Sequence, residues 1–252
     1  MVVAGNPNVS RLADLVCSAN HFVVLTGAGV STESGLPDFR GRGTGLWEEV
    51  DPMEVLSADA LEYRPDLFYT TGLSLLGAFT EVEPNEAHKA LARLEQAGLL
   101  KAVITQNIDS LHQKAGSRRV IEVHGHLREA TCMECGRKFP FCKLAEKAKA
   151  GEVPPRCECG GKMRPDVVLF GDPMPPAFAE AVEEANRSDF MLVIGSSLQV
   201  APAAYLPRLA GRLAIINMEP TPYDWRAEVV IREKAGLTMS QLIQELVERG
   251  VI

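Results

Sequence analysis

An apolar run that passes directly into a glycine turn constrains this chain more than any other feature. Phe22–Thr26 is short and rich in β-branched residues, and Gly27-Ala28-Gly29 follows it at once. A buried strand that ends in such a turn can bring backbone N–H groups close to a phosphate, because glycine has no side chain to collide with the ligand. The third glycine of the G-x-G-x-x-G fingerprint is missing, since Val30–Thr32 comes next. The pattern therefore predicts a ligand-binding strand end, but not that of an ordinary dinucleotide dehydrogenase.

The loop after this turn brings together three kinds of side chain that can act on a ligand. Gly35-Leu36-Pro37 leads into Asp38, Phe39 and Arg40, which supply an acid, an aromatic ring and a permanent cation. A Gly-x-Gly turn alone is a weak signal, because many tight turns use it. The loop strengthens the prediction that this region binds a small molecule.

Polar residues also follow two later apolar runs, which end at Thr105 and Val123. In an open parallel sheet, ligands bind beyond the carboxyl ends of the strands, so these polar side chains are expected to face the same crevice as the glycine turn. A lone histidine is usually structural, but one at a strand end beside other polar strand ends is a candidate catalytic base. The residues concerned are Gln106, Asn107 and Asp109 after the first run and His124 after the second.

Short apolar runs alternate with amphipathic segments along most of the chain. We predict strands at 22–26, 102–105, 120–123, 167–170, 190–194, 213–217 and 229–231. We predict helices at 9–19, with Ser10 as the N-cap, and at 85–97, 176–186 and 237–249. This order is typical of an α/β fold with a doubly wound, Rossmann-like parallel sheet.

Two stretches interrupt this alternation. Residues 41–80 contain glycines and an aromatic cluster but no clear strand, and residues 127–164 contain paired cysteines and a basic helical piece. Both leave the predicted sheet and return to it, so we expect the two insertions to form one small helical and zinc-binding domain. The Rossmann-like domain then comprises residues 1–40, 81–126 and 165–252.

Four of the six cysteines fall into two close pairs. Cys132-x-x-Cys135 is similar to a zinc knuckle, and Cys157-x-Cys159 would supply the other two thiolates of one structural zinc ion. The second pair is irregular, with one intervening residue, so Cys142 remains an alternative ligand. A nucleic-acid-binding zinc ribbon is the competing interpretation, and the net charge of −7 argues against it.

The composition sets broader limits. A chain of 252 residues that is 46% hydrophobic can bury a sizeable core, and no apolar run approaches the ~20 residues of a membrane span. The N-terminal residues Met1 to Pro7 lack the basic and apolar regions of a secretory signal, so we expect a cytoplasmic protein. Neither membrane association nor direct nucleic-acid binding is expected.

Taken in order, these motifs resemble those of the sirtuin family, of the bacterial or archaeal type. The resemblance runs from about Asn20 to about Ala235 and implies an NAD-dependent protein-lysine deacylase. Besides the cysteine pairs, it rests on Gly27-Ala28-Gly29, Gly35 to Arg40, Thr105 to Asp109, His124-Gly125 and Gly195-Ser196-Ser197.

The resemblance implies roles for single residues. His124 would be the general base on a ribose hydroxyl, which suits an imidazole whose pKa lies near working pH. Asn107 would orient ribose hydroxyls and a water, and Ile108, Asp109 and Phe39 would form the nicotinamide pocket. The expected NAD contacts are Gly27, Ala28, Gly29, Thr32, Phe39, Arg40, Gln106, Asn107, Ile108, Asp109, His124, Gly195, Ser196, Ser197, Asn217 and Ala235. The expected peptide contacts are Val168, Phe170 and Gly171.

The resemblance also implies the substrates. An acylated-lysine protein or peptide would bind as an extended strand, and NAD would be consumed to give nicotinamide, free lysine and O-acetyl-ADP-ribose. The Tyr-x-x-Arg pair of family members that prefer acidic acyl chains is absent from Phe68–Gly72, which favours acetyl. Another NAD-consuming activity, such as ADP-ribosyl transfer or NAD hydrolysis, and a non-catalytic NAD- or ADP-ribose-binding module remain as alternatives.

Overall fold

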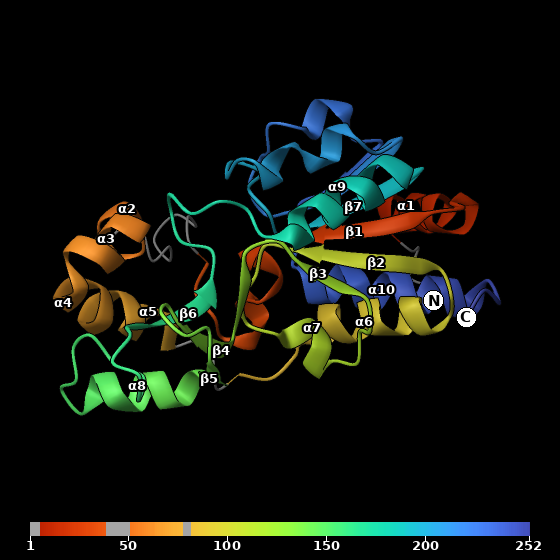
Figure 1. The fold of residues 1–252 in the computed structure, drawn as a ribbon. Helices are drawn as coiled ribbons and strands as arrows, with labels where there is room; N and C mark the ends of the chain where they lie inside the picture. Colours follow the sequence, from red (N-terminus) through yellow and green to blue (C-terminus); the bar gives the residue numbers. More distant parts are fainter. Residues whose placement is uncertain (1–5, 39–50, 78–81) are drawn as a thin grey trace.

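The computed structural model describes residues 6–38, 51–77 and 82–252, and these form a larger and a smaller part (Figure 1). The larger part is built on a six-stranded sheet of order β3-β2-β1-β7-β8-β9, in which every neighbouring pair is parallel. Its strands are β1 (Phe22–Thr26), β2 (Leu100–Thr105), β3 (Val120–Glu122), β7 (Phe190–Ile194), β8 (Arg212–Ile216) and β9 (Val229–Ile231). The predicted α/β class is confirmed.

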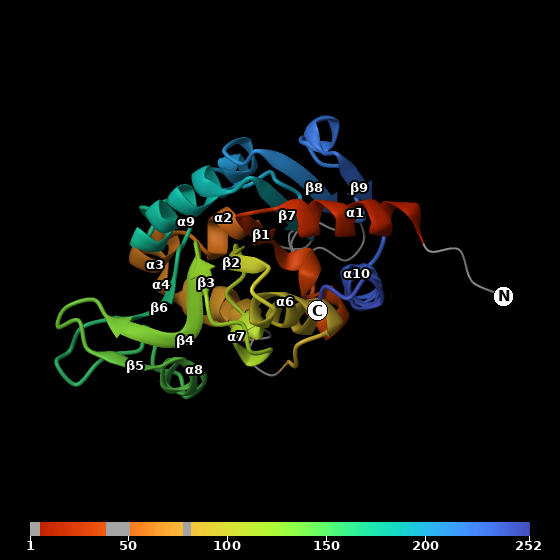
Figure 2. The ribbon, with the colours of Figure 1, turned by 90° about the vertical axis from the view of Figure 1, so that its right-hand side faces the viewer.

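Helices cover both faces of this sheet (Figures 1 and 2). Side chains of successive strand residues point to opposite faces, so Val24 belongs to one core and Leu25 to the other. Because both faces are covered, β1 is buried at every position and its sequence is almost entirely apolar. One face packs against α1 (Pro7–Ser18), α6 (Glu86–Gln96) and α10 (Ala235–Glu248), and the other against α9 (Pro176–Arg187) and the 3-10 helix η5 (Ala203–Arg208).

The strand order reverses at β1. The chain adds β2 and β3 on one side of β1 and then adds β7, β8 and β9 on the other. Such a reversal leaves a crevice at the carboxyl ends of the two central strands, because the connections leave them in opposite directions. The turns that carry Gly27 and Gly195 follow β1 and β7, so both lie at this point.

The smaller part combines the two insertions around one hydrophobic core. Phe68 and Tyr69 from the first insertion pack with Leu144 and Met163 from the second, and the Tyr69 hydroxyl donates to the Met163 carbonyl oxygen at 2.6 Å. The second insertion forms a three-stranded antiparallel sheet of order β5-β4-β6. The elements are α2 (Pro52–Val55), α3 (Ala58–Tyr63), α4 (Pro65–Leu67), the π-helix η4 (Phe68–Gly72), α5 (Leu73–Gly77), β4 (Gly125–Cys132), β5 (Lys138–Pro140), α8 (Phe141–Lys149) and β6 (Met163–Val167).

Short helical elements complete the larger part: the 3-10 helices η1 (Ala28–Val30), η2 (Thr32–Ser34) and η6 (Asp224–Arg226), and α7 (Leu111–Lys114). The division into domains at residues 1–40, 81–126 and 165–252 against 41–80 and 127–164 remains our proposal. Strands β4 and β6 both cross its limits, since β4 begins at Gly125 and β6 ends at Val167. Across the described residues, no helix combines the length and apolarity that crossing a membrane requires.

Two predictions about single elements are wrong. Of the strand predicted at 167–170 in the parallel sheet, only Val167 lies in a strand; this is the last residue of β6, which runs antiparallel to β4 in the small sheet, and the residues after it form a loop. In β6 buried residues alternate with half-buried ones, which is the pattern of a sheet with one covered face. The first helix begins at Pro7 because the Asn6 side chain accepts the Asn8 N–H at 3.0 Å, so Asn6 rather than Ser10 is the N-cap.

Candidate active site

A cavity of about 890 Å³ lies at the carboxyl ends of the central strands, where the larger part meets the smaller one. It brings together every described residue that the sequence predicted to contact NAD or peptide. From the NAD set these are Gly27, Ala28, Gly29, Thr32, Gln106, Asn107, Ile108, Asp109, His124, Gly195, Ser196, Ser197, Asn217 and Ala235, and from the peptide set Val168, Phe170 and Gly171. The remaining two, Phe39 and Arg40, lie outside the described residues.

Two glycine turns pack directly on each other at the floor of this cavity. The Gly27 N–H donates to the Ile194 carbonyl at 3.1 Å, and the Gly29 N–H donates to the Gly195 carbonyl at 2.8 Å. A Cβ atom on Gly27 would lie 2.8 Å from the Gly195 oxygen. The turns after β1 and β7 can therefore touch only because neither has a side chain between them.

Replacing Gly195 with alanine is expected to force these turns apart. The residue has a φ of +63°, and its added Cβ would lie 2.2 Å from the Val30 nitrogen. We expect a loss of about 1–3 kcal/mol in the free energy of unfolding, together with weaker nucleotide binding. Urea unfolding and calorimetric titration with ADP-ribose measure the two effects.

Gly250→Ala is the matched control for this substitution. Gly250 also has a positive φ, of +69°, but no atom lies within 4 Å of its added Cβ. This variant therefore carries the backbone penalty without the collision. ADP-ribose affinity of Gly195→Ala equal to that of Gly250→Ala would contradict the predicted collision.

Ser31 links the glycine turn to the residues that follow β2. Its hydroxyl donates to the Asp109 carboxylate at 2.7 Å and accepts from the Asn107 amide nitrogen at 3.0 Å. The Leu111 N–H donates to the other oxygen of Asp109 at 2.9 Å. Burial raises the pKa of Asp109, and these hydrogen bonds act against that rise. No role for Ser31 was predicted from the sequence, although a polar residue just after a ligand-binding turn is a signal that could have identified it.

His124 follows β3 and is held by the backbone of the neighbouring strand end. Its Nδ1 lies 3.0 Å from the Gln106 carbonyl oxygen. Because a carbonyl can only accept, Nδ1 carries the proton and Nε2 keeps its lone pair. Burial lowers the pKa of His124, so the ring is neutral at neutral pH and can act as a base. Gln106 is itself fixed, since its amide nitrogen donates to the Ser196 hydroxyl at 2.8 Å.

The adenosine end predicted for the cavity lies between β8 and α10. The Asn217 amide donates to the Glu219 carbonyl at 2.7 Å, which fixes the side chain just beyond the strand. The Gly236 N–H in the first turn of α10 donates to the Glu33 carboxylate at 2.6 Å. An acidic side chain thus already occupies this helix N-terminus, where a negative charge is favourable. Ala235 lines the cavity beside it.

A pair of fully buried histidines lies behind Ser31. The rings of His88 and His112 have centroids 4.9 Å apart, and both side chains are almost inaccessible to solvent. His88 Nδ1 accepts the Asn85 N–H at 3.3 Å, and His112 Nε2 lies 2.9 Å from the Thr26 hydroxyl. Burial lowers the pKa of His88 to about 4 and that of His112 well below its usual value. Both are therefore neutral in the folded protein near pH 7.

Because of the buried histidine pair, we expect the folded protein to lose stability as the pH falls. An unfolded histidine titrates near pH 6.5, whereas His88 titrates near 4 when folded. Between these values the unfolded state binds more protons, so the free energy of unfolding falls as pH falls, by about 1.4 kcal/mol per pH unit. Urea unfolding from pH 7 to 4 should show this slope reduced in His88→Gln. The raised pKa of Asp109 acts in the opposite sense, so the test is the difference between the two proteins. Parallel curves for the two would contradict the prediction.

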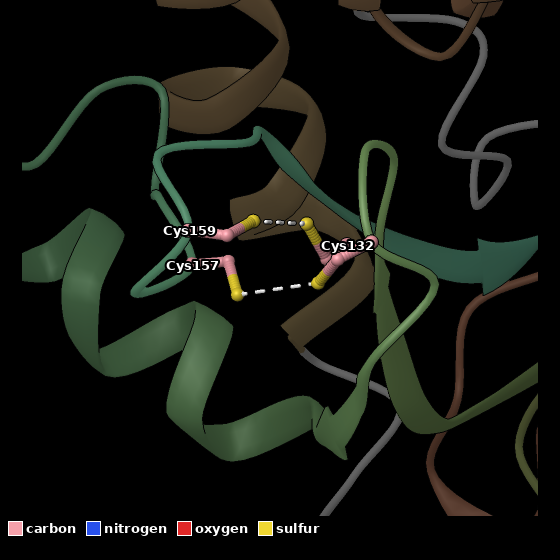
Figure 3. Close-up of side chains that lie close together, drawn as sticks. Cys132, Cys157 and Cys159 are labelled. Atoms are coloured by element: carbon pink, nitrogen blue, oxygen red, sulfur yellow. Dashed lines mark hydrogen bonds between the residues drawn. The ribbon is translucent and has the colours of Figure 1, made fainter.

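The four paired cysteines converge at the tip of the small sheet (Figure 3). The sulfur atoms of Cys132 and Cys159 lie 3.5 Å apart, those of Cys135 and Cys157 lie 3.8 Å apart, and all four lie within 4.8 Å of one another. With Zn–S bonds of about 2.3 Å, a tetrahedral ion needs sulfur atoms about 3.8 Å apart. The residues therefore fit one zinc ion with four thiolates.

A local backbone turn explains how Cys157 and Cys159, with only one residue between them, can both be ligands of one zinc ion. The Gly160 N–H donates to the Cys157 carbonyl at 2.9 Å, and Gly160 has a φ of +90°, so the chain reverses at once and both sulfurs face the knuckle. Backbone N–H groups of Cys135 and Glu134 help lower the pKa of the Cys132 thiol to about 6, whereas hydrogen bonds with the neighbouring cysteines raise the pKa of Cys159 to about 12. Cys142, the alternative ligand, is exposed and lies outside this group in the described structure.

The predicted peptide contacts lie on a loop that is held from two sides. The Val168 N–H donates to the His124 carbonyl at 2.9 Å. Phe170 pairs with the first insertion, since its N–H donates to the Leu56 carbonyl at 3.1 Å and its carbonyl accepts the Ala58 N–H at 2.9 Å. The Asp172 carboxylate accepts the Leu169 N–H at 2.8 Å. The loop is thus fixed beside His124.

Comparison with known proteins identifies the family. The family model described as Sir2 family matches residues 27–202. An "NAD-dependent protein deacetylase 2" of Caldanaerobacter subterraneus subsp. tengcongensis is 54% identical over 92% of this chain and 93% of its own length. Among solved structures, Sir2 with a deacetylated peptide and 3′-O-acetyl ADP ribose has a TM-score of 0.89 and 37% identity, covering 97% of this chain and 99% of its own. Sir2 with a peptide and NAD+ has a TM-score of 0.83 and 36% identity over 96% and 98%. The chain therefore belongs to the Sir2 family, the sirtuins that its sequence motifs resemble.

Proposed function

We propose that this chain is an NAD-dependent protein-lysine deacetylase. One observation carries the proposal: His124 lies in a single cavity between the paired glycine turns and the Val168–Gly171 loop. A base fixed between a nucleotide site and a peptide site is what group transfer between two bound substrates requires. The relatives support it, since one is named a deacetylase and the solved structures hold NAD+, peptide and acetylated ADP ribose.

In the proposed reaction the acetyl group moves from a lysine nitrogen to ADP-ribose. The acetyl oxygen attacks the ribose carbon that carries nicotinamide, so no side-chain nucleophile is needed. His124 Nε2 then accepts the proton of a ribose hydroxyl, which attacks the acetyl carbon. Water completes the release of free lysine and O-acetyl-ADP-ribose. The hydrogen bond from Nδ1 to the Gln106 carbonyl keeps the tautomer that this step requires.

The remaining site residues divide among the parts of NAD. The carboxylate of Asp109 is held by Ser31 and Leu111, so it can present a fixed acceptor to the nicotinamide carboxamide. Asn107 and Gln106 orient ribose hydroxyls and a water. The diphosphate is held by Gly27, Ala28, Gly29 and Thr32, and ribose and phosphate are held by Gly195, Ser196 and Ser197. Adenosine is held by Asn217 and Ala235. In this proposal nicotinamide is enclosed by Ile108 and Phe39, and Arg40 contacts phosphate.

The proposed peptide substrate binds as an extended strand along Val168, Phe170 and Gly171, mainly through backbone hydrogen bonds. A neutral, acetyl-like acyl group suits the apolar residues that line the cavity, among them Leu56 and Leu76. The Tyr69 hydroxyl donates its hydrogen bond to the Met163 carbonyl, and Tyr69 does not line the cavity.

We also propose a cytoplasmic location. All six cysteines are free of disulfides in the structure. A four-thiolate zinc site needs a compartment that keeps its cysteines reduced, and the cytoplasm does so.

Mass spectrometry of the products tests the proposed function. The protein is incubated with NAD and an acetyl-lysine peptide, and O-acetyl-ADP-ribose, free-lysine peptide and nicotinamide should form in equal amounts. Nicotinamide release that does not need the acetylated peptide would indicate NAD hydrolysis instead. ADP-ribose attached to the peptide would indicate ADP-ribosyl transfer, and binding of NAD without turnover would indicate a non-catalytic module.

A further inference from the structure

A second hollow, of about 550 Å³, lies beside the active-site cavity. Two of its aromatic side chains are unusually open to solvent, Trp225 at 83% and Tyr205 at 51% of their full exposure. Large exposed aromatic rings that gather around a depression typically mark a binding surface. We call this feature the aromatic–arginine hollow; it is lined by Leu198, Gln199, Ala201, Ala204, Tyr205, Arg208, Pro222, Tyr223, Trp225 and Arg226.

The guanidinium of Arg208 is held in place at this hollow. Its Nε donates to the Tyr223 hydroxyl at 2.8 Å, and its Cζ lies 4.9 Å from the centre of the Tyr205 ring and 5.7 Å from that of Tyr223. Stacking on aromatic rings restrains the side chain, and Arg208 is still exposed to solvent. An arginine fixed in this way loses little conformational freedom when it binds a carboxylate.

Arg226 fixes the wall of the hollow. Its guanidinium donates to the carbonyl of Pro207 at 2.5 Å and also to that of Ala210, so it joins η6 to the end of η5. The hollow is therefore a formed surface of two short helices and does not depend on a ligand for its shape.

The charge around the hollow is opposite to that of the whole chain. The chain has a net charge of −7, yet the described residues that line the hollow include two arginines and no acidic side chain. Asp224 is close in sequence, but its carboxylate is bound by Arg232 and by the Thr221 hydroxyl. Locally the surface thus suits a negatively charged group.

The hollow borders the cavity proposed to bind peptide. Gln199 and Ala201 line both cavities, and the main cavity on their other side is also lined by the Val168–Gly171 loop. An extended peptide gains about 3.3 Å per residue, so substrate residues a few positions from the acyl-lysine lie well away from the reacting carbon. A substrate that follows Gln199 and Ala201 out of the cleft would meet Tyr205, Arg208 and Trp225.

We propose that the aromatic–arginine hollow is a distal subsite that binds an acidic residue of the substrate protein, a few positions from the acyl-lysine. This inference rests on the proposed deacetylase function. In the subsite, Arg208 pairs with the Asp or Glu carboxylate of the substrate, and Tyr205 and Trp225 contact the substrate residues next to it. The main cleft accepts acyl-lysine with little sequence preference, and the hollow adds selectivity for proteins with an acidic flank.

The test uses pairs of acetyl-lysine peptides that differ only by glutamate or glutamine at one position, scanned over six positions on each side of the lysine. At the position that reaches the hollow, we expect the glutamate peptide to have a KM about fivefold below that of its glutamine twin. In Arg208→Ala this ratio should fall to about one, while the KM for NAD and the KM for the glutamine peptide stay unchanged.

Arg118→Ala is the matched control, because Arg118 is an exposed arginine just before β3 and does not line the hollow. It removes the same charge and should leave the glutamate preference intact. Peptide affinity is measured in parallel by fluorescence anisotropy. If no peptide is turned over, the proposed function fails, and the affinities still decide on the subsite. Equal affinity for glutamate and glutamine peptides at every position, or a preference that persists in Arg208→Ala, would overturn the subsite.

Discussion

Replacing His124 with alanine is expected to lower deacetylation by about 10²–10⁴-fold, the usual contribution of a positioned general base. The imidazole carries its proton on Nδ1, against the Gln106 carbonyl, and offers Nε2 to a ribose hydroxyl. Alanine removes that acceptor and leaves the peptide-binding loop in place, because the loop is held by the His124 backbone carbonyl and not by its side chain. Turnover of an acetyl peptide with NAD, and affinity for that peptide, should therefore respond separately.

His126→Ala provides the comparison for this variant. His126 lies two residues after His124, in β4, and does not line the cavity. It should retain wild-type turnover. Wild-type turnover in His124→Ala would remove His124 from the mechanism, and loss of peptide affinity in that variant would mean that the ring supports the loop as well as the chemistry.

Removal of zinc is expected to unfold the smaller part of the molecule. The cysteine cluster joins the turn after β4 to the turn before β6, two segments that are separated along the chain. Binding of a structural zinc ion contributes on the order of 10 kcal/mol to folding in small zinc domains, so its loss should exceed the stability of this part. Because Phe170 pairs with Leu56 and Ala58, peptide binding and activity should be lost together with the fold.

Metal content, melting temperature and deacetylase activity are measured before and after treatment with a strong chelator. Cys132→Ser and Cys157→Ser should reproduce the chelated state, whereas Cys142→Ser, at an exposed cysteine outside the cluster, should behave as wild type. Unchanged melting and activity after complete removal of the metal would show that the ion is not structural.

Much of the candidate site could be predicted from local sequence because of a property of parallel sheets. All strands point the same way, so residues just after Thr26, Thr105 and Ile194 must meet at one edge. This is why Gln106, His124 and the Gly195 turn could be assigned to one crevice before any contact was known. The cysteine ligands could also be predicted from the sequence, because a zinc site needs four donors and the two cysteines of each pair lie close in sequence.

Features that depend on distant packing could not be predicted in this way. The apolar run Val167–Phe170 looks like a buried strand, but its N–H groups go to His124 and to Leu56, so it ends one strand and begins a loop. Strand formation is decided by such partners more than by composition. Likewise, the role of Ser31 depends on Asp109 and Asn107, which are more than 70 positions away in the chain.

The hydrogen bond between the Val168 N–H and the His124 carbonyl has a consequence for attempts to redesign this enzyme. This bond joins His124, the proposed base, to Val168, a proposed peptide contact. A shift of either backbone should therefore move the other. Laboratory evolution toward new protein targets through changes around Val168 should therefore alter turnover as well as recognition. Variation at more remote surfaces gives a way to change target choice while sparing the chemical step.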